Sequence, residues 1–146
     1  MNKESSNNLI VAIRIKGMLK LNTQFKETLH RLRLRRKYAC VLINPTKESL
    51  GMINKVKQMI AFGNIDDKTL LELIEKRGQP IDKSVKIDPK AAAEAIKKGE
   101  NSQDYNLKPF FRLHPPRKGI KSKEPYPKGV LGNHKEKIND LIKRML

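Results

Sequence analysis

Short apolar runs divide the first 63 residues into three predicted strands. The runs LIVAIRI at residues 9–15 and YACVLI at residues 38–43 are rich in β-branched residues, which is typical of buried strands. A third, shorter strand is predicted at residues 59–62, ending at Gly63. Each run has the length of an ordinary strand, not of a helix.

The stretches between these runs repeat apolar residues at helical spacing. The first carries Phe25, Leu29 and Leu32 on one face, with Asn22 as its predicted N-cap. A second helix is predicted from Thr46, and its apolar face consists of Leu50, Ile53, Val56 and Ile60. The resulting β-α-β-α-β order predicts a small sheet with helices packed on it.

Two more helices are predicted after the third strand. Asp66 is a good N-cap for a helix that runs to Arg77, with Gly78 at C′. Its buried face is predicted to consist of Leu70, Leu73 and Ile74. The next helix opens at Asp88-Pro89 and ends before Gly99. Its AAAEA stretch has high helix propensity but little to bury.

The chain ends in a strongly amphipathic pattern. Asn133 and Glu136 resemble a capping box. The apolar residues that follow at i, i+3, i+4 and i+7 are Ile138, Leu141, Ile142 and Met145. We expect this helix to dock on the core. The fold class is therefore α+β, with a helical and basic C-terminal extension.

Composition indicates one small basic domain. The chain has 146 residues, 38% of them apolar, and a formal net charge of +17. This charge opposes compaction and favours a polyanionic partner. No apolar run approaches the ~20 residues of a membrane span, and the polar start lacks a signal-peptide core, so no membrane partner is expected. The single cysteine, Cys40, excludes an intrachain disulfide and fits a cytoplasmic setting.

The positive charge is concentrated towards the two ends of the chain. Residues 1–63 carry 13 basic and 3 acidic side chains, residues 64–104 carry 8 and 9, and residues 105–146 carry 11 and 3. Such segregation favours a binding surface plus a part that faces elsewhere. We divide the chain into a polar tail (1–8), a basic α+β core (9–63), a neutral helical insert (64–106) and a basic arm with the final helix (107–146).

Catalytic chemistry finds little support in the sequence. The three histidines show no ligand-like spacing, and a single cysteine excludes a cysteine-based zinc site. Cys40 sits in an apolar strand, where a buried inert thiol is favoured over a nucleophile. Helix capping explains Asp66-Asp67 better than a catalytic carboxylate pair does. There is no phosphate-binding glycine loop, so neither an enzyme, a cofactor nor a small-molecule substrate is expected.

The strongest functional signal is the basic density of two segments. From Arg14 to Lys37 there are nine basic residues and one acid. A solvated helix face with cations at its C-terminus would account for one or two of them. The cluster of Arg33, Arg35, Arg36 and Lys37 exceeds that need, and arginine suits bidentate phosphate contacts. We therefore favour phosphate binding over a solvated face.

The second segment is FRLHPPRKG at residues 111–119, within an acid-free stretch from Lys108 to Lys123. The proline pair fixes the backbone, so the segment is predicted to be a polyproline-like strut anchored by Phe110, Phe111 and Leu113. A strut ordered in advance would lose less conformational entropy on binding a polyanion. A structural loop that crosses the core is the alternative.

The order of five segments resembles a known family. These are LIVAIRIKG, LHRLRLRRKYACVLI, GMINKVKQMIAFGNID, FRLHPPRKG and KINDLIKRML. They resemble large-subunit ribosomal protein thirty, called protein seven in eukaryotes. The extension past Gly63 and the short start favour the archaeal form.

The resemblance implies a ferredoxin-like core with a three-stranded sheet and helices on one face. It also implies a structural role in the ribosome, without catalysis, with large-subunit ribosomal RNA and neighbouring ribosomal proteins as partners. A free-standing nucleic-acid-binding protein, such as an RNA chaperone or a chromosomal protein, is the alternative. The matched basic positions are Arg14, Lys16, Arg31, Arg33, Arg35, Arg36, Lys37, Arg112, Arg117 and Lys118. The basic segments add Lys20, His114, Lys121, Lys123 and Lys128 to the predicted RNA-binding residues.

Overall fold

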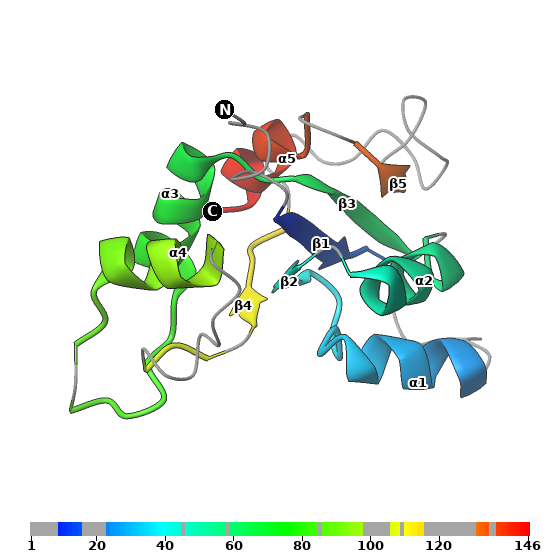
Figure 1. Ribbon diagram of the computed structural model, residues 1–146, viewed down its shortest axis with the longest axis horizontal. Helices are drawn as coiled ribbons and strands as arrows, with labels where there is room; N and C mark the ends of the chain where they lie inside the picture. The colour runs from blue at the N-terminus through cyan, green and yellow to red at the C-terminus, as the bar shows by residue number, and fades with distance from the viewer. Residues whose placement is uncertain are drawn as a thin grey trace.

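The predicted β-α-β-α-β order is confirmed by the computed structural model of the chain (Figure 1). The structure describes residues 9–15, 23–44, 46–57, 59–84, 86–97, 106–108, 110–115, 131–134 and 137–146. The core elements are β1 (Ile10–Arg14), α1 (Thr23–Arg31), β2 (Ala39–Ile43), α2 (Lys47–Lys55) and β3 (Ile60–Asn64). Asn22 and Gly99, the predicted boundaries of two helices, lie outside the described residues.

The three predicted strands form the centre of a larger sheet. Its order is β4-β2-β1-β3-β5, with the two-residue strands β4 (Phe111–Arg112) and β5 (Gly132–Asn133) at its edges. β1 is central and pairs antiparallel with β2 and β3, while β5 pairs parallel with β3. The prediction that Gly63 ends the third strand is wrong, because Gly63 lies inside β3 opposite Val11.

Helices cover both faces of this sheet. The alternation along β1 sends Val11 and Ile13 into one cluster and Ile10 and Ala12 into the other. The second cluster contains residues of α1 and α2, so the core helices share one face as predicted. The first contains residues of α3 (Asp67–Arg77), α4 (Pro89–Lys97) and α5 (Ile138–Met145). Figure 1 shows these two helical layers on opposite sides of the strands.

α2 departs from its predicted apolar face. Thr46 caps the helix, its hydroxyl accepting a hydrogen bond from the Ser49 backbone N–H at 3.1 Å. Ile53 and Val56 are buried as predicted. Leu50 is 45% exposed, however, and Ile60 belongs to β3. The helix ends at Lys55. The predicted apolar face is therefore wrong at Ile60, which belongs to a strand whose side chains repeat every two residues and not every 3.6.

α3 and α4 form a packed pair. The Asp66 carboxylate accepts a hydrogen bond from the Thr69 backbone N–H at 2.7 Å, which confirms the predicted cap. Gly78 has φ −64°, so the helix ends there without a left-handed residue. The expectation that α4 has little to bury is wrong. Its alanines pack closely against α3, and the buried residues of α4 are Ala92, Ala93, Ala95 and Ile96.

α5 docks on the core as predicted, but with a different start. Asn133 lies in β5 opposite Phe62, so it is not the N-cap, and Glu136 lies outside the described residues. Lys137 holds the cap position without a side-chain hydrogen bond. Asn139 instead ties the helix to the sheet: it accepts from the Asp66 N–H at 3.0 Å and donates to the Asn64 carbonyl at 3.3 Å.

Among the described residues, none of the helices combines the length and apolar character that crossing a membrane requires.

Candidate nucleic-acid interface

The basic cluster after α1 begins with a tight helix C-terminus. The Leu34 N–H donates to the Leu29 carbonyl at 2.8 Å, and the Arg33 N–H donates to the His30 carbonyl at 3.0 Å. This pair of bonds is a Schellman motif, and Arg33 occupies its left-handed position with φ 65°. Glycine is the usual residue there, because a side chain in this conformation costs about 1–2 kcal/mol. The chain therefore carries a strained arginine where glycine would serve the turn better.

Arg14 fixes the chain just beyond this turn. It is the last residue of β1 and only 1% exposed, and its Nη1 donates to the Leu34 carbonyl at 2.9 Å. Burial lowers the pKa of the Arg14 guanidinium, although arginine stays protonated in proteins. Contact of Arg14 with RNA stays a prediction, and the structure shows a hydrogen-bond partner for its guanidinium within the protein. Strand alternation turns its side chain towards the α1–α2 layer, so we assign it a positioning role.

Tyr38 closes the basic turn at its other end. Its φ is 66°, a second left-handed residue that is not glycine. The Tyr38 N–H donates to the Arg14 carbonyl at 2.6 Å, and its own carbonyl accepts from the Leu113 N–H at 3.1 Å. Residues 33–38 are therefore held by β1 at both ends and joined to the segment around β4.

The pairing of β2 with β4 brings the two basic segments together. Ala39 lies opposite Arg112, although 72 residues separate them in the chain. A groove of about 480 Å³ lies where they meet. We call it the basic groove; its lining is Arg33, Arg35, Arg36, Lys37, Tyr38, Ala39, Phe110, Arg112 and Leu113. These described lining residues include five cations and no acid.

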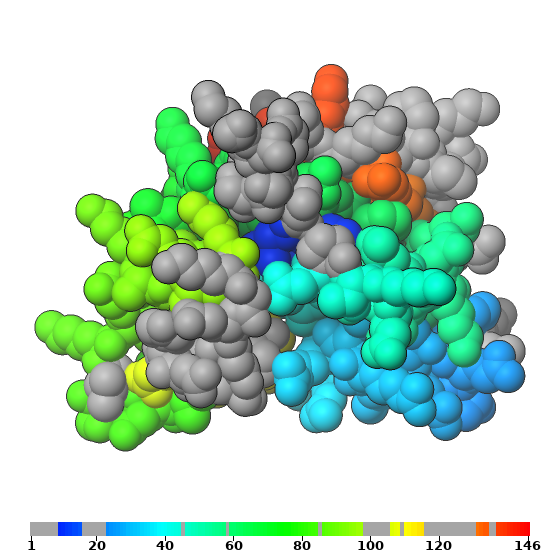
Figure 2. Space-filling model, in the orientation of Figure 1, coloured from blue at the N-terminus to red at the C-terminus, as the bar shows by residue number. Residues whose placement is uncertain are grey.

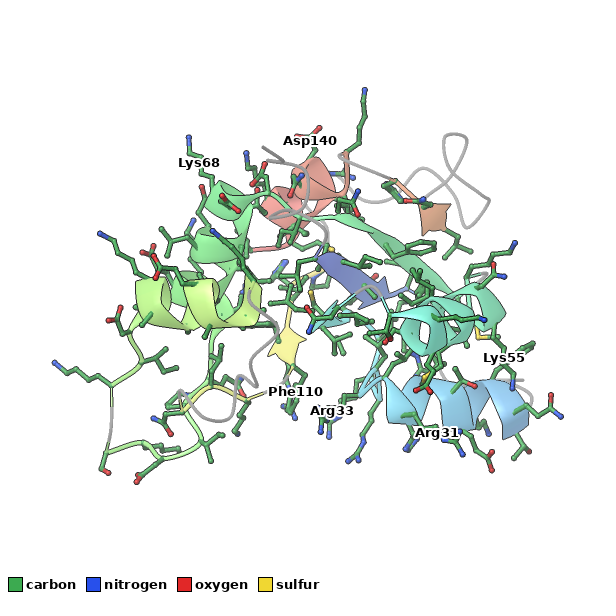
Figure 3. All side chains as sticks on the ribbon, in the orientation of Figure 1. Arg31, Arg33, Lys55, Lys68, Phe110 and Asp140 are labelled. Atoms are coloured by element: carbon green, nitrogen blue, oxygen red, sulfur yellow. The ribbon has the colours of Figure 1, made fainter. Side chains whose placement is uncertain are left out.

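Figure 3 shows Arg33 and Phe110 next to each other at one edge of the molecule, with Lys68 and Asp140 at the opposite edge.

Aromatic rings accompany the cations of the groove. The Lys37 Nζ lies 5.2 Å from the centre of the Tyr38 ring, and the Arg112 Cζ lies 5.8 Å from the centre of the Phe110 ring. Such contacts hold a cation over a π face while leaving its polar edge accessible.

The remaining predicted residues divide into two groups. Arg31 is exposed on α1 but does not line the groove. His114 is exposed; its Nδ1 lies 2.7 Å from the Pro115 carbonyl, and its backbone N–H donates to the Met145 carbonyl at 2.9 Å. The predicted residues outside the described ranges are Lys16, Lys20, Arg117, Lys118, Lys121, Lys123 and Lys128.

The FRLHPPRKG segment is anchored as its sequence indicated. Phe111 and Leu113 are buried in the α3–α5 layer, and Phe110 packs at the edge of the α1–α2 layer. Pro115 is described and exposed, whereas Pro116 lies outside the described residues, so the stiffness of the strut stays a prediction.

The described residues contain neither a reactive thiol nor a cluster of metal ligands. Burial raises the pKa of the fully enclosed Cys40 thiol above its usual range, which keeps it protonated and unreactive. No three His, Cys, Asp or Glu side chains in the described ranges gather as metal ligands would. An α+β domain with a groove whose described lining is rich in cations and free of acids is instead typical of proteins that bind nucleic acid.

Comparisons with known proteins identify relatives among ribosomal proteins. The family of ribosomal protein L30p/L7e matches residues 10–60, from β1 to the start of β3. The large ribosomal subunit protein uL30 of Archaeoglobus fulgidus is 40% identical, covering 94% of this chain and 99% of the relative. The proteins of the same name from Methanoculleus marisnigri and Methanococcus maripaludis are 38% and 36% identical, covering 94% and 92% of this chain and 99% and 97% of theirs.

The chain therefore belongs to the ribosomal protein L30p/L7e family, in its archaeal form. This is a family of ribosomal proteins with a structural role, not of enzymes. The prediction of the family from the sequence is confirmed.

The positioning role of Arg14 predicts a local effect of its removal. In Arg14→Met the Leu34 carbonyl loses its buried donor, which costs about 1–3 kcal/mol. We expect amide hydrogen exchange at residues 34–38 to accelerate roughly 5- to 150-fold relative to β1–β3 amides. Arg31→Met removes an exposed cation and should leave this ratio unchanged. Equal protection of residues 34–38 in Arg14→Met and parent would refute the role.

The strained turn predicts a stabilising substitution. Arg33→Gly relieves the left-handed conformation, so the free energy of unfolding should rise by about 1 kcal/mol in urea titrations. Arg35→Gly is the control, because Arg35 is not among the residues with positive φ. That change should stabilise nothing. A loss of stability in Arg33→Gly would mean that the Arg33 side chain itself holds the turn.

Proposed function

We propose that this protein binds large-subunit ribosomal RNA through the basic groove and the cations around it. Its role there is structural: it neutralises phosphates and holds RNA segments in place. The observation that carries the proposal is the meeting of two basic segments at the β2–β4 edge, where five of the described residues that line the groove are cations and none is an acid.

The distribution of charge supports this orientation. The groove lies at one edge of the sheet, while α3 and α4 belong to the neutral insert of residues 64–106. In Figure 2 the residues of α1 and those of α3 and α4 occupy opposite sides of the visible face. The exposed acids Asp67, Glu75 and Glu94 lie on α3 and α4. A phosphate surface that approaches the groove edge therefore meets positive charge, and the mixed-charge helices remain for solvent or a protein neighbour.

The groove suits contacts to the RNA backbone. Arginine forks can bind two phosphate oxygens at once. Contacts to phosphate and sugar position a protein on RNA, and they recognise the shape of the nucleic acid more than its sequence. A structural ribosomal protein needs this kind of recognition, because each particle presents one folded arrangement of RNA.

The family argues against a free-standing nucleic-acid-binding protein. As a member of a ribosomal protein family, this chain acts in the ribosome, in the cytoplasm. The relatives are named as proteins of the large ribosomal subunit, which supports the large subunit as the particle in which this chain assembles. RNA and neighbouring ribosomal proteins are the partners that this setting provides.

Phosphate binding predicts the salt dependence of RNA affinity. For a large-subunit rRNA fragment, about 6–10 phosphate contacts give a slope of log K against log[salt] of roughly −4 to −9. Replacing Arg35, Arg36 and Lys37 together by alanine removes up to three contacts. The slope should become shallower by about 2–3 and the affinity should fall.

A matched variant separates the groove from overall charge. Lys68, Lys76 and Lys90 are exposed on α3 and α4, so replacing all three by alanine removes the same charge far from the groove. This variant should keep most of the parent's slope, with a change of less than about 1. Equal losses in the two triple variants would mean that net charge, not the groove, determines binding.

A further inference from the structure

We propose that the basic groove holds one unpaired nucleotide of the RNA, with its base stacked against the Phe110 ring and its phosphates on the arginines of the 33–38 turn. The inference rests on the proposed function, which requires only contacts to the phosphate backbone. It adds a binding site for a base, and thus for an unpaired position in the RNA.

The lining of the groove has two different chemical characters. One part is cationic: Arg33, Arg35 and Arg36 project from the turn. The other part is aromatic and aliphatic, with Phe110, Tyr38 and Leu113. Phosphate neutralisation alone needs only the first part. The combination matches a nucleotide, which carries a flat apolar base and a charged phosphate on one sugar.

Phe110 is placed as a stacking platform. It is only partly buried, whereas its neighbour Phe111 is 2% exposed and belongs to the core. The guanidinium of Arg112 lies 5.8 Å from the Phe110 ring centre. RNA-binding proteins stack splayed-out bases on aromatic rings and on arginine planes. In Phe110 and Arg112 the groove offers both kinds of partner, already in contact.

The size of the groove limits what can enter. Its volume of about 480 Å³ lies at the lower end of the range for small-molecule sites, roughly 300–1,000 Å³. A paired RNA helix cannot enter such a space, because its bases are stacked and paired. A single base that leaves the stack can enter.

Backbone strain converges on the same place. Arg33 and Tyr38 both line the groove, and both are non-glycine residues with positive φ. Strained conformations of this kind persist where surrounding bonds impose them, and they cluster at ligand sites. Here the bonds are those of Leu34 to Arg14 and of Tyr38 to Arg14 and Leu113. The groove is therefore formed before RNA arrives, which lowers the ordering cost of binding.

Single-stranded RNA with and without bases tests the site. The probes are an oligouridine of about six nucleotides and an abasic ribose-phosphate strand of equal length and charge. The parent chain should bind oligouridine roughly 5- to 150-fold more tightly than the abasic strand, the range that corresponds to one stacked base. In Phe110→Leu this preference should fall close to one, while affinity for the abasic strand stays at the parent's value.

A fluorescent reporter locates the base. The chain has no tryptophan, so Phe110→Trp introduces a single one into the groove. Oligouridine should quench its emission and the abasic strand should not, because only a stacked base contacts the indole. Phe62→Trp is the control: Phe62 lies on β3, which is separated from β4 by β1 and β2. Its emission should respond to neither strand.

The outcomes distinguish the nucleotide site from the proposed function, which is binding of rRNA through its phosphates. Equal affinity of the parent for both strands, with a steep salt dependence, would overturn the nucleotide site and leave phosphate binding intact. A base preference that survives in Phe110→Leu would place the base elsewhere and overturn this site. If the parent bound neither strand and did not bind the rRNA fragment, both the nucleotide site and the proposed phosphate binding would be overturned.

Discussion

The hydrogen bond from the buried Arg14 guanidinium to the Leu34 carbonyl is the constraint on which the basic edge depends. A cation at the end of the central strand loses much of its hydration, and it persists there because it satisfies a backbone acceptor. The same residue's carbonyl receives the Tyr38 N–H. Arg14 therefore fixes both ends of the turn of residues 33–38. The arginines of this turn repel one another, and the two bonds to Arg14 oppose that repulsion.

The rest of the interface follows from long-range pairing. Tyr38 leads into β2, and β2 pairs with the short strand β4. This pairing brings the turn next to Phe110 and Arg112, which lie much later in the sequence. Burial of Phe111 and Leu113 in the opposite layer holds that strand in place. The helices α3, α4 and α5 pack on the other face of the sheet, and none of their residues is among the described residues that line the groove. They therefore stabilise the fold without covering the basic groove.

Local patterns predicted the elements well, since strand runs, helical spacing and the Asp66 cap depend on neighbouring residues. The errors have physical causes. Gly63 reads as a breaker but is tolerated in β3, and the alanines of α4 bury surface by close approach instead of by size. The match of basic positions to the family includes Arg14 among the predicted RNA-binding residues because such a match counts charge without its direction, whereas the structure buries the Arg14 guanidinium against the Leu34 carbonyl. The two basic segments were each predicted, but their convergence and the left-handed Arg33 depend on contacts between distant residues, for which the sequence has no local signal.

The central claim is that residues 33–38 and 110–112 form one surface against RNA. A cryo-electron microscopy structure of the large ribosomal subunit assembled with this protein tests it most directly. The account predicts phosphate oxygens within about 3 Å of guanidinium nitrogens from both segments around the groove. A groove open to solvent, or covered by a neighbouring protein while RNA contacts the α3–α4 face, would contradict it.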